Sequence, residues 1–250
     1  MKYFLQFSYN GKLYHGWQNQ PNAITVQQVL EQTISTILRE EISLMGAGRT
    51  DAGVHAIQMF AHFEMEAIIN IPEVVYKLNA MLPDDIAVQQ IEQVEPDAHA
   101  RFDAISRTYE YWVIPQKNPF YMDSAHYVKR QLNVQKMNEA AQLLLQYDDF
   151  ECFSKSNTDV HTYLCDISAA AWKEKGALLV FSITANRFLR NMVRAIVGTL
   201  LDVGSGKSTV DDVKAIINSK NRSQAGTSVP AKGLYLTKVI YPKSIFKNNG

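Results

Sequence analysis

The chain has little of several features that would fix its class at once. Among its 250 residues only Cys152 and Cys165 are cysteines, too few for a disulfide framework and typical of reduced thiols. No apolar run approaches the roughly 20 residues of a membrane helix, because Arg194 interrupts the longest candidate at residues 192–201. The first residues turn polar by Gln6 and predict no signal peptide. We therefore expect a cytoplasmic globular protein.

The formal net charge of the chain is zero, but this value is the sum of an acidic first half and a basic second half. Residues 1–104 carry six basic and thirteen acidic side chains, whereas residues 105–250 carry nineteen basic and twelve acidic ones. The positive second half suggests an anionic partner. A contact between the two halves, or between subunits, explains the same numbers equally well.

The spacings of common metal sites are absent from the sequence. There is no His-Glu-x-x-His and no Cys-x-x-Cys, and His161 with Cys165 lacks the pairing of a zinc site. His55 and His62 fall on opposite faces of one expected strand, since an odd separation reverses the side-chain direction. We expect no metal.

Hydrophobic periodicity predicts an α+β fold. Strands are expected at residues 3–9, 42–45, 54–65, 86–94, 107–114, 167–172, 178–185 and 234–241, and helices at residues 26–38, 73–81, 134–146, 187–203 and 210–219. Strands come in consecutive pairs with helices between them. We therefore expect two similar halves, residues 1–104 and 105–250, each a mainly antiparallel sheet with flanking helices, joined around a central catalytic cleft.

The segment GSGKST at residues 204–209 invites comparison with a phosphate-binding P-loop. The P-loop pattern requires a glycine where Leu201 stands, and it follows a strand rather than a helix. Capping explains the segment better: Gly204 would follow the end of one helix, and Ser208 or Thr209 would cap the next.

The expected helix at residues 187–203 is apolar around most of its circumference. At 100° per residue a narrow polar stripe remains, formed by Arg187, Arg190, Asn191, Arg194 and Gly198. A solvated face is the common explanation of such a stripe. Its narrowness favours arginines that line a cleft or face a partner.

Basic and aromatic residues alternate on the strand at residues 107–114. Arg107, Tyr109, Tyr111 and Val113 share one face. Such a face can bind phosphate and stack a nucleobase, as nucleic-acid surfaces do. Core tyrosines are at least as common, so the strand alone does not decide between the two.

The most informative segment is GAGRTDAGVHA at residues 46–56, which joins two expected strands. Arg49, Thr50 and Asp51 are suspended among three glycines, and a turn alone needs far fewer residues. Glycines allow a backbone to approach a ligand closely, and charged residues on such a loop form a candidate site. Only one carboxylate is present, so the paired carboxylates of glycoside hydrolysis are not evident.

Residues 48–55 (GRTDAGVH) strongly resemble the signature of the TruA family of tRNA pseudouridine synthases. Further matching segments follow in family order: residues 14–18 (YHGWQ), 99–102 (HARF), 107–111 (RTYEY), 188–194 (FLRNMVR) with 196–198 (IVG), and 233–236 (GLYL). Each could arise by chance, but together they cover nearly the whole chain and are highly specific.

The resemblance implies an isomerase that converts uridine to pseudouridine at position 38, 39 or 40 of the tRNA anticodon arm. It implies a homodimer that binds tRNA, without metal or organic cofactor. Asp51 corresponds to the catalytic aspartate, Arg49 to the arginine that fills the gap left by the flipped base, Tyr109 to the tyrosine against the uracil, and Arg194 to the basic partner of the aspartate. The first half would carry the catalytic loop, and the second half the RNA-binding surface with Arg107, Arg187 and Arg190.

The chain departs from the family pattern in one place. Many relatives carry an arginine around residues 162–167, where this sequence reads TYLCDI. One expected tRNA contact is thereby in doubt.

Two other functions are weighed against the synthase: a structured-RNA-binding module without catalysis, in which Asp51 would be expendable, and a nucleotide hydrolase, which rests only on the glycine-rich segments.

Overall fold

The computed structural model describes residues 1–66, 70–155 and 160–247. The chain divides into two compact units, Met1–Ile105 with Tyr235–Gly250, and Ser106–Leu234. Each unit is a sheet with helices, which confirms the α+β class. We describe the two units in turn.

The sheet of the first unit is mostly antiparallel. Its strands are β1 (Lys2–Tyr9), β2 (Met45–Gly46), β3 (His55–Glu64), β4 (Ile86–Val94) and β9 (Leu234–Ile240). β1 lies between β3 and β4 and is antiparallel to both, and β2 pairs with β3. β9 instead runs parallel to β3, with His55 opposite Tyr235 and Ala56 opposite Leu236.

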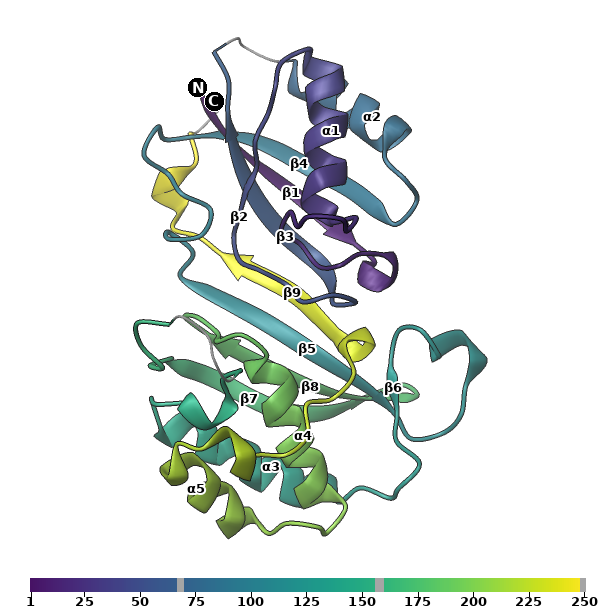
Figure 1. Ribbon diagram of the computed structural model, residues 1–250, viewed down its shortest axis with the longest axis vertical. Coiled ribbons are helices and arrows are strands. Elements are labelled where there is room, and N and C mark those ends of the chain that lie inside the picture. Colours follow the sequence, from purple (N-terminus) through teal and green to yellow (C-terminus); the bar gives the residue numbers. More distant parts are fainter. Residues whose placement is uncertain (67–69, 156–159, 248–250) are drawn as a thin grey trace. The chain divides into compact units, whose positions relative to one another are not determined.

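Two helices, α1 (Val26–Leu38) and α2 (Ile71–Met81), lie over one face of this sheet (Figure 1). α1 begins at Val26, as predicted, and is capped by Thr25, whose hydroxyl accepts a hydrogen bond from the Gln28 N–H at 3.3 Å. The buried side chains of α1 recur at helical spacing: Val26, Leu30 and Ile34.

The opposite face of the sheet is also buried in part, because Tyr241 and Phe246 of the C-terminal segment pack against it. Phe4 packs edge-on against Tyr241 at 5.1 Å and against Phe246 at 6.0 Å between ring centroids. Phe60 meets Tyr241 in the same way. Strict alternation in residues 54–65 would place Ile57 on one buried face with Met59, Ala61, Phe63 and Met65. The structure differs, because Phe60 on the other face is buried and Ile57 is 49% exposed.

The second unit has a central strand flanked by two antiparallel neighbours. β8 (Leu178–Ala185) pairs with β5 (Ser106–Ile114) and β7 (Ile167–Lys175), and the short β6 (His126–Tyr127) adds to β5 in parallel. Helices α3 (Val134–Leu143), α4 (Met192–Gly204) and α5 (Val210–Ser219) cover one face (Figure 1).

The predicted helix at residues 187–203 begins later than expected. α4 starts at Met192, because Asn191 adopts a left-handed conformation (φ 66°, ψ 3°) that a right-handed helix cannot continue. Arg187 and Arg190 consequently precede the helix, and the predicted five-residue stripe is wrong. Only Arg194 and Gly198, four residues apart, share a helical face.

The segment after α4 is confirmed as a cap rather than a P-loop. Thr209 accepts from the Asp212 N–H at 3.1 Å, and Asp212 accepts from the Thr209 N–H at 2.7 Å, forming a capping box. Gly204 is itself the last residue of α4 rather than the residue after its end, and Gly206 has a positive φ of 76°.

Two further boundaries differ from the prediction. The expected strand at residues 42–45 is reduced to β2. The last strand, expected in the second half, belongs with the first unit because β9 pairs with β3 and residues 241–246 pack on Phe4. In the described part of the chain no helix is both long and apolar enough to cross a membrane.

Candidate active site

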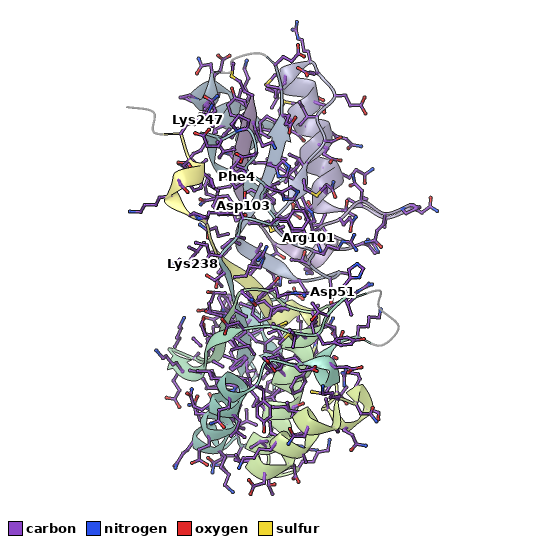
Figure 2. The ribbon with its side chains drawn as sticks, turned by 90° about the vertical axis from the view of Figure 1, so that its left-hand side faces the viewer. Phe4, Asp51, Arg101, Asp103, Lys238 and Lys247 are labelled. Atoms are coloured by element: carbon purple, nitrogen blue, oxygen red, sulfur yellow. The ribbon has the colours of Figure 1, made fainter. Side chains whose placement is uncertain are left out.

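The Asp51 loop, residues 47–54, connects β2 to β3 and carries the candidate carboxylate (Figure 2). Main-chain hydrogen bonds from an earlier segment hold it on both sides of Asp51. The Trp17 N–H donates to the Thr50 carbonyl at 3.2 Å, and the Gly53 N–H donates to the Tyr14 carbonyl at 3.2 Å. The Val54 N–H closes a turn onto the Asp51 carbonyl at 3.1 Å. The loop is therefore tied to residues 14–17.

Glycine is required where these two segments touch. Gly16 has φ +88°, and a Cβ there would lie 2.3 Å from the Thr50 carbonyl oxygen. A Cβ on Gly46 would lie 2.5 Å from the indole nitrogen of Trp17. Close backbone approach thus explains why the glycines of residues 14–18 and 46–56 occur together.

Buried polar contacts fix the loop further. The hydroxyls of Tyr9 and Thr50 lie 2.8 Å apart in a buried hydrogen bond. His55 is 2% exposed, accepts from the Gly11 N–H through Nδ1 at 3.1 Å, and stacks on Tyr235 with ring centroids 4.6 Å apart. Thr50 and His55 are thus anchors whose importance the sequence did not reveal.

The three central side chains of the loop differ in exposure. Thr50 points inward and is 9% exposed, Asp51 is half-buried, and Arg49 is exposed. The loop therefore presents a carboxylate at fixed backbone geometry with a guanidinium two residues away. Such a carboxylate can act as a nucleophile or stabilise developing positive charge.

In the second unit Arg194 occupies the first turn of α4 and is half-buried. Its Nε donates to the Val229 carbonyl at 2.7 Å, and the Val229 N–H donates to the Arg194 carbonyl at 3.2 Å. Val229 ends a segment, residues 225–229, that we call the strap. This anchoring segment contains no charged side chain, and sequence analysis missed it.

The two tyrosines that share one face of β5, Tyr109 and Tyr111, differ in burial. Tyr111 is fully buried, and its hydroxyl donates to the Pro230 carbonyl at 2.8 Å. Burial raises the pKa of Tyr111, so the phenol stays protonated. Tyr109 is half-buried, and its ring meets Phe188 edge-on at 5.1 Å. Tyr111 is a core residue, and Tyr109 remains the candidate for base contact.

The other predicted arginines do not form one array. Arg107 is half-buried, and its Nη1 donates to the Asn186 carbonyl at 2.9 Å. Arg187 is half-buried and Arg190 exposed, both in the segment before α4. The Arg190 carbonyl accepts from the Lys155 N–H at 3.0 Å.

The two cysteines lie in the core of the second unit. Both are buried, and burial raises the pKa of Cys152 to about 12 and that of Cys165 to about 11. A thiol that remains protonated at neutral pH is a poor nucleophile. Cys165 lies within residues 162–167, the stretch around which many relatives carry an arginine, and its N–H donates to the Asp148 carbonyl at 2.8 Å.

Metal binding finds no support in the described ranges 1–66, 70–155 and 160–247. Within them, no three histidine, cysteine, aspartate or glutamate side chains are grouped closely enough to hold an ion.

Comparison with known proteins assigns the family. The model of a family described as tRNA pseudouridine synthase matches residues 6–103 and 140–242. The chain belongs to this family. Among its relatives, the tRNA pseudouridine synthase A proteins of Bacteroides fragilis and Porphyromonas gingivalis are each 50% identical, over 98% of this chain and 98% or 99% of theirs. The Bacillus subtilis protein of the same name is 42% identical over 94% of this chain and 96% of its own. The chain is accordingly an RNA-modifying isomerase.

Proposed function

We propose that this member of the tRNA pseudouridine synthase family converts uridine to pseudouridine at one or more of positions 38, 39 and 40 of the tRNA anticodon arm. Asp51 is the catalytic carboxylate in this proposal. The observation that carries it is the construction of the Asp51 loop, where a half-buried carboxylate sits between the two main-chain bonds to Tyr14 and Trp17.

The chemistry requires a nucleotide outside the stack and a carboxylate beside it. The N1–C1′ bond of the uridine breaks, the uracil turns, C5 bonds to C1′, the C5 proton leaves, and N1 gains a proton. Atoms and electrons balance without a cofactor, because the product is an isomer of the substrate. A base inside a helix must first be flipped outward. An ionised Asp51 can bond to the nucleotide or stabilise the charge that develops as the glycosidic bond breaks.

The remaining residues take the roles that the family resemblance implies. Arg49 fills the space left by the flipped base, Tyr109 contacts the uracil, and Arg194 is the basic partner of the carboxylate. Arg107, Arg187 and Arg190 bind the tRNA backbone in this proposal. The half-exposed ring of Tyr109 and the exposure of Arg49 and Arg190 agree with these roles.

The proposal extends to assembly and location. We expect a cytoplasmic homodimer that binds the anticodon arm and works without metal or nucleotide cofactor. The opposite charges of residues 1–104 and 105–250 agree with binding of RNA mainly by the second half.

The test is to incubate the purified protein with unmodified tRNAs that carry uridine at each of the three positions, and to map pseudouridine by nucleotide. We expect product at positions 38–40 and none in the other stems. Product confined to another arm of the tRNA would contradict the site assignment. Binding of the anticodon arm without any product would favour the RNA-binding module.

A further inference from the structure

The strap crosses α4 at main-chain contact distance, on the face that holds Arg194. A Cβ on Gly198 would lie 1.9 Å from the Thr227 carbonyl oxygen, and a Cβ on Gly226 would lie 2.6 Å from the Thr199 nitrogen. The Gly226 N–H donates to the Thr199 hydroxyl at 2.9 Å, which itself donates to the Ala195 carbonyl at 3.0 Å. The strap therefore fills the space that Gly198 leaves on this helical face.

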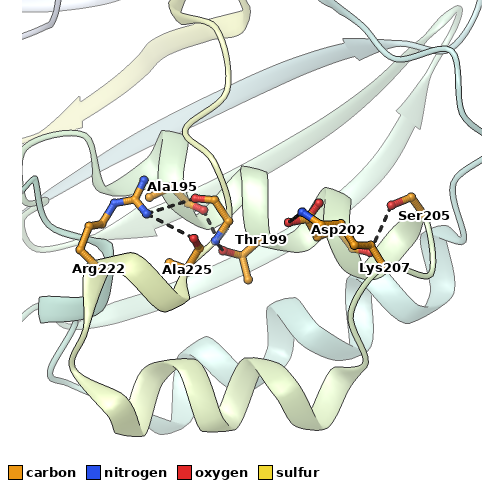
Figure 3. A network of polar contacts seen from close by, with 8 residues as sticks. Ala195, Thr199, Asp202, Ser205, Lys207, Arg222 and Ala225 are labelled. Carbon is orange, nitrogen blue, oxygen red and sulfur yellow. Dashed lines mark hydrogen bonds and ion pairs between the residues drawn. The ribbon is translucent and has the colours of Figure 1, made fainter.

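One side chain fastens the strap at several points. Arg222 donates through Nη1 to the Gly226 carbonyl at 3.2 Å and the Ala225 carbonyl at 3.4 Å, and through Nη2 to the Ser228 hydroxyl at 2.8 Å. Figure 3 shows Arg222 and Ala225 together with Thr199 and Ala195 of α4. A guanidinium has its donors in a rigid plane, so these bonds set the conformation of the strap.

The Ser228 hydroxyl also accepts a hydrogen bond from the residue that precedes α4. The Asn191 side-chain nitrogen donates to the Ser228 hydroxyl at 2.6 Å, although Asn191 makes no side-chain cap to the helix. Next in the strap, Val229 binds Arg194 through both its carbonyl and its N–H. Hydrogen bonds at Ser228 and Val229, joined by the main chain between these two residues, thus connect Arg222 to the guanidinium of Arg194.

We propose that Arg222 is a positioning residue for the isomerase reaction, which acts by holding the strap and thereby the orientation of Arg194. Arg222 need not touch the RNA. A hydrogen bond at Nε fixes the plane of the Arg194 guanidinium, so that an anion bound by Arg194 meets its two terminal nitrogen atoms in a set direction. This inference rests on the proposed role of Arg194.

The experiment measures single-turnover rate constants at saturating enzyme, together with tRNA affinity and thermal unfolding. We expect Arg222→Met to lower the rate constant by about 10- to 100-fold, since a misplaced active-site group costs that much. The affinity for tRNA should stay unchanged. Arg222→Lys should recover part of the rate, because an ammonium can donate to some of the same carbonyls. If Arg222→Met fails to fold, the smaller change Ser228→Ala replaces it in the experiment. This variant should also lower the single-turnover rate constant.

Lys207→Met is the matched control, because it removes a cation that pairs with Asp202 at 3.1 Å toward the other end of the same helix (Figure 3). Its rate should equal that of the parent. A merely structural role of Arg222 predicts lower stability with an unchanged rate constant for the folded fraction, and that result would overturn the proposal.

A double-mutant cycle separates this inference from the function beneath it. In an Arg194→Lys background, Arg222→Met should have little further effect, because the residue through which it acts has been altered. Equal losses in both backgrounds would overturn the positioning role while leaving Arg194 important. If Arg194→Lys alone kept the rate constant of the parent protein, the proposed role of Arg194 would be contradicted. The positioning role of Arg222, which acts through Arg194, would then be contradicted as well.

Discussion

The Asp51 loop and the first turn of α4 are both held by a second segment of chain, but through different atoms. Asp51 is placed by main-chain bonds of its neighbours Thr50 and Gly53, whereas Arg194 is held through its own Nε. The position of the carboxylate therefore depends on backbone conformation, and that of the guanidinium depends on the strap. The comparison predicts that different substitutions should disturb the two regions.

The largest effects are expected from glycines at the two contacts. Gly16→Ala should remove activity and lower the free energy of unfolding by about 2–4 kcal/mol, since a clash of backbone with Cβ adds to strain at positive φ. Gly198→Ala should push the strap off α4 and lower activity as strongly. The measurements are denaturant unfolding and pseudouridine formation.

Two other glycines provide the controls. Gly176 and Gly206 also have positive φ, of 59° and 76°, but a Cβ at either would meet nothing within 4 Å. Their alanine variants should lose only about 1 kcal/mol and keep full activity. If Gly176→Ala and Gly16→Ala behaved alike, close approach to Thr50 would not explain the loop.

A smaller effect is expected at the buried hydroxyl pair. Thr50→Val keeps the shape of the side chain but leaves the Tyr9 hydroxyl without its Thr50 partner, and should cost about 1–2 kcal/mol. Activity should fall only modestly, because the main-chain bonds to residues 14–17 remain. Thermal unfolding of Thr50→Val, Tyr9→Phe and the double variant measures this. The double variant should lose less than the sum of the two single losses.

The arginines before α4 should affect binding alone. Arg187→Ala and Arg190→Ala should each weaken tRNA affinity several-fold and reduce the slope of log affinity against log salt by up to about one unit. The single-turnover rate at saturation should not change, because neither residue belongs to the set of hydrogen bonds around Arg194. Filter binding at several salt concentrations tests this, and parental slopes in both variants would mean that these arginines do not bind phosphate.

An effect of pH rather than of substitution is a loss of stability in acid, and it should be greater in the first unit. Burial, together with His99 and Lys2, lowers the pKa of His62 to about 4, although Glu64 and Asp103 oppose this, and the pKa of His99 is also lowered. The unfolded chain binds these protons near pH 6.5, so stability should fall as the pH drops from there toward 4.

The second unit offers a comparison for this pH dependence. Its His126 also has a lowered pKa, caused by burial and by Lys232. The second unit has this one imidazole with a lowered pKa, whereas the first unit has the adjacent pair His62 and His99. We therefore expect the stability of the second unit to depend less on pH. Hydrogen exchange of peptides from each unit between pH 7 and pH 5 measures this. Equal acid sensitivity of the two units would contradict the assignment to His62 and His99.

Sequence patterns predicted most elements but not the contacts between distant segments. The helix at residues 26–38, the cap at Thr209 and the strand at residues 178–185 follow from local signals, and all three are confirmed. The start of α4 was mispredicted because the helical periodicity continues through Asn191, which is left-handed and whose side chain donates to Ser228, 37 residues away.

From the residue pattern alone, the candidate site was predictable only where its residues are contiguous, and Tyr109 and Arg194 were named through the family resemblance. Residues 46–56 stand out because glycines and charges occur together, so Arg49 and Asp51 could be named from sequence. Val229 and Arg222 could not, because main-chain carbonyls leave no trace in composition and Arg222 lies in no motif that we noted. The burial of Tyr111 beside a half-exposed Tyr109 likewise depends on packing that strand periodicity does not show.

The central claim is that Asp51 carries the chemistry, and Asp51→Asn tests it most directly. Asparagine has nearly the same size and suits the same turns, but it lacks the negative charge. Affinity for tRNA and pseudouridine yield should be measured side by side, with the exposed Asp84→Asn as the control. The account predicts parental affinity and no detectable product for Asp51→Asn, and full activity for Asp84→Asn. Multiple turnovers by Asp51→Asn would contradict it.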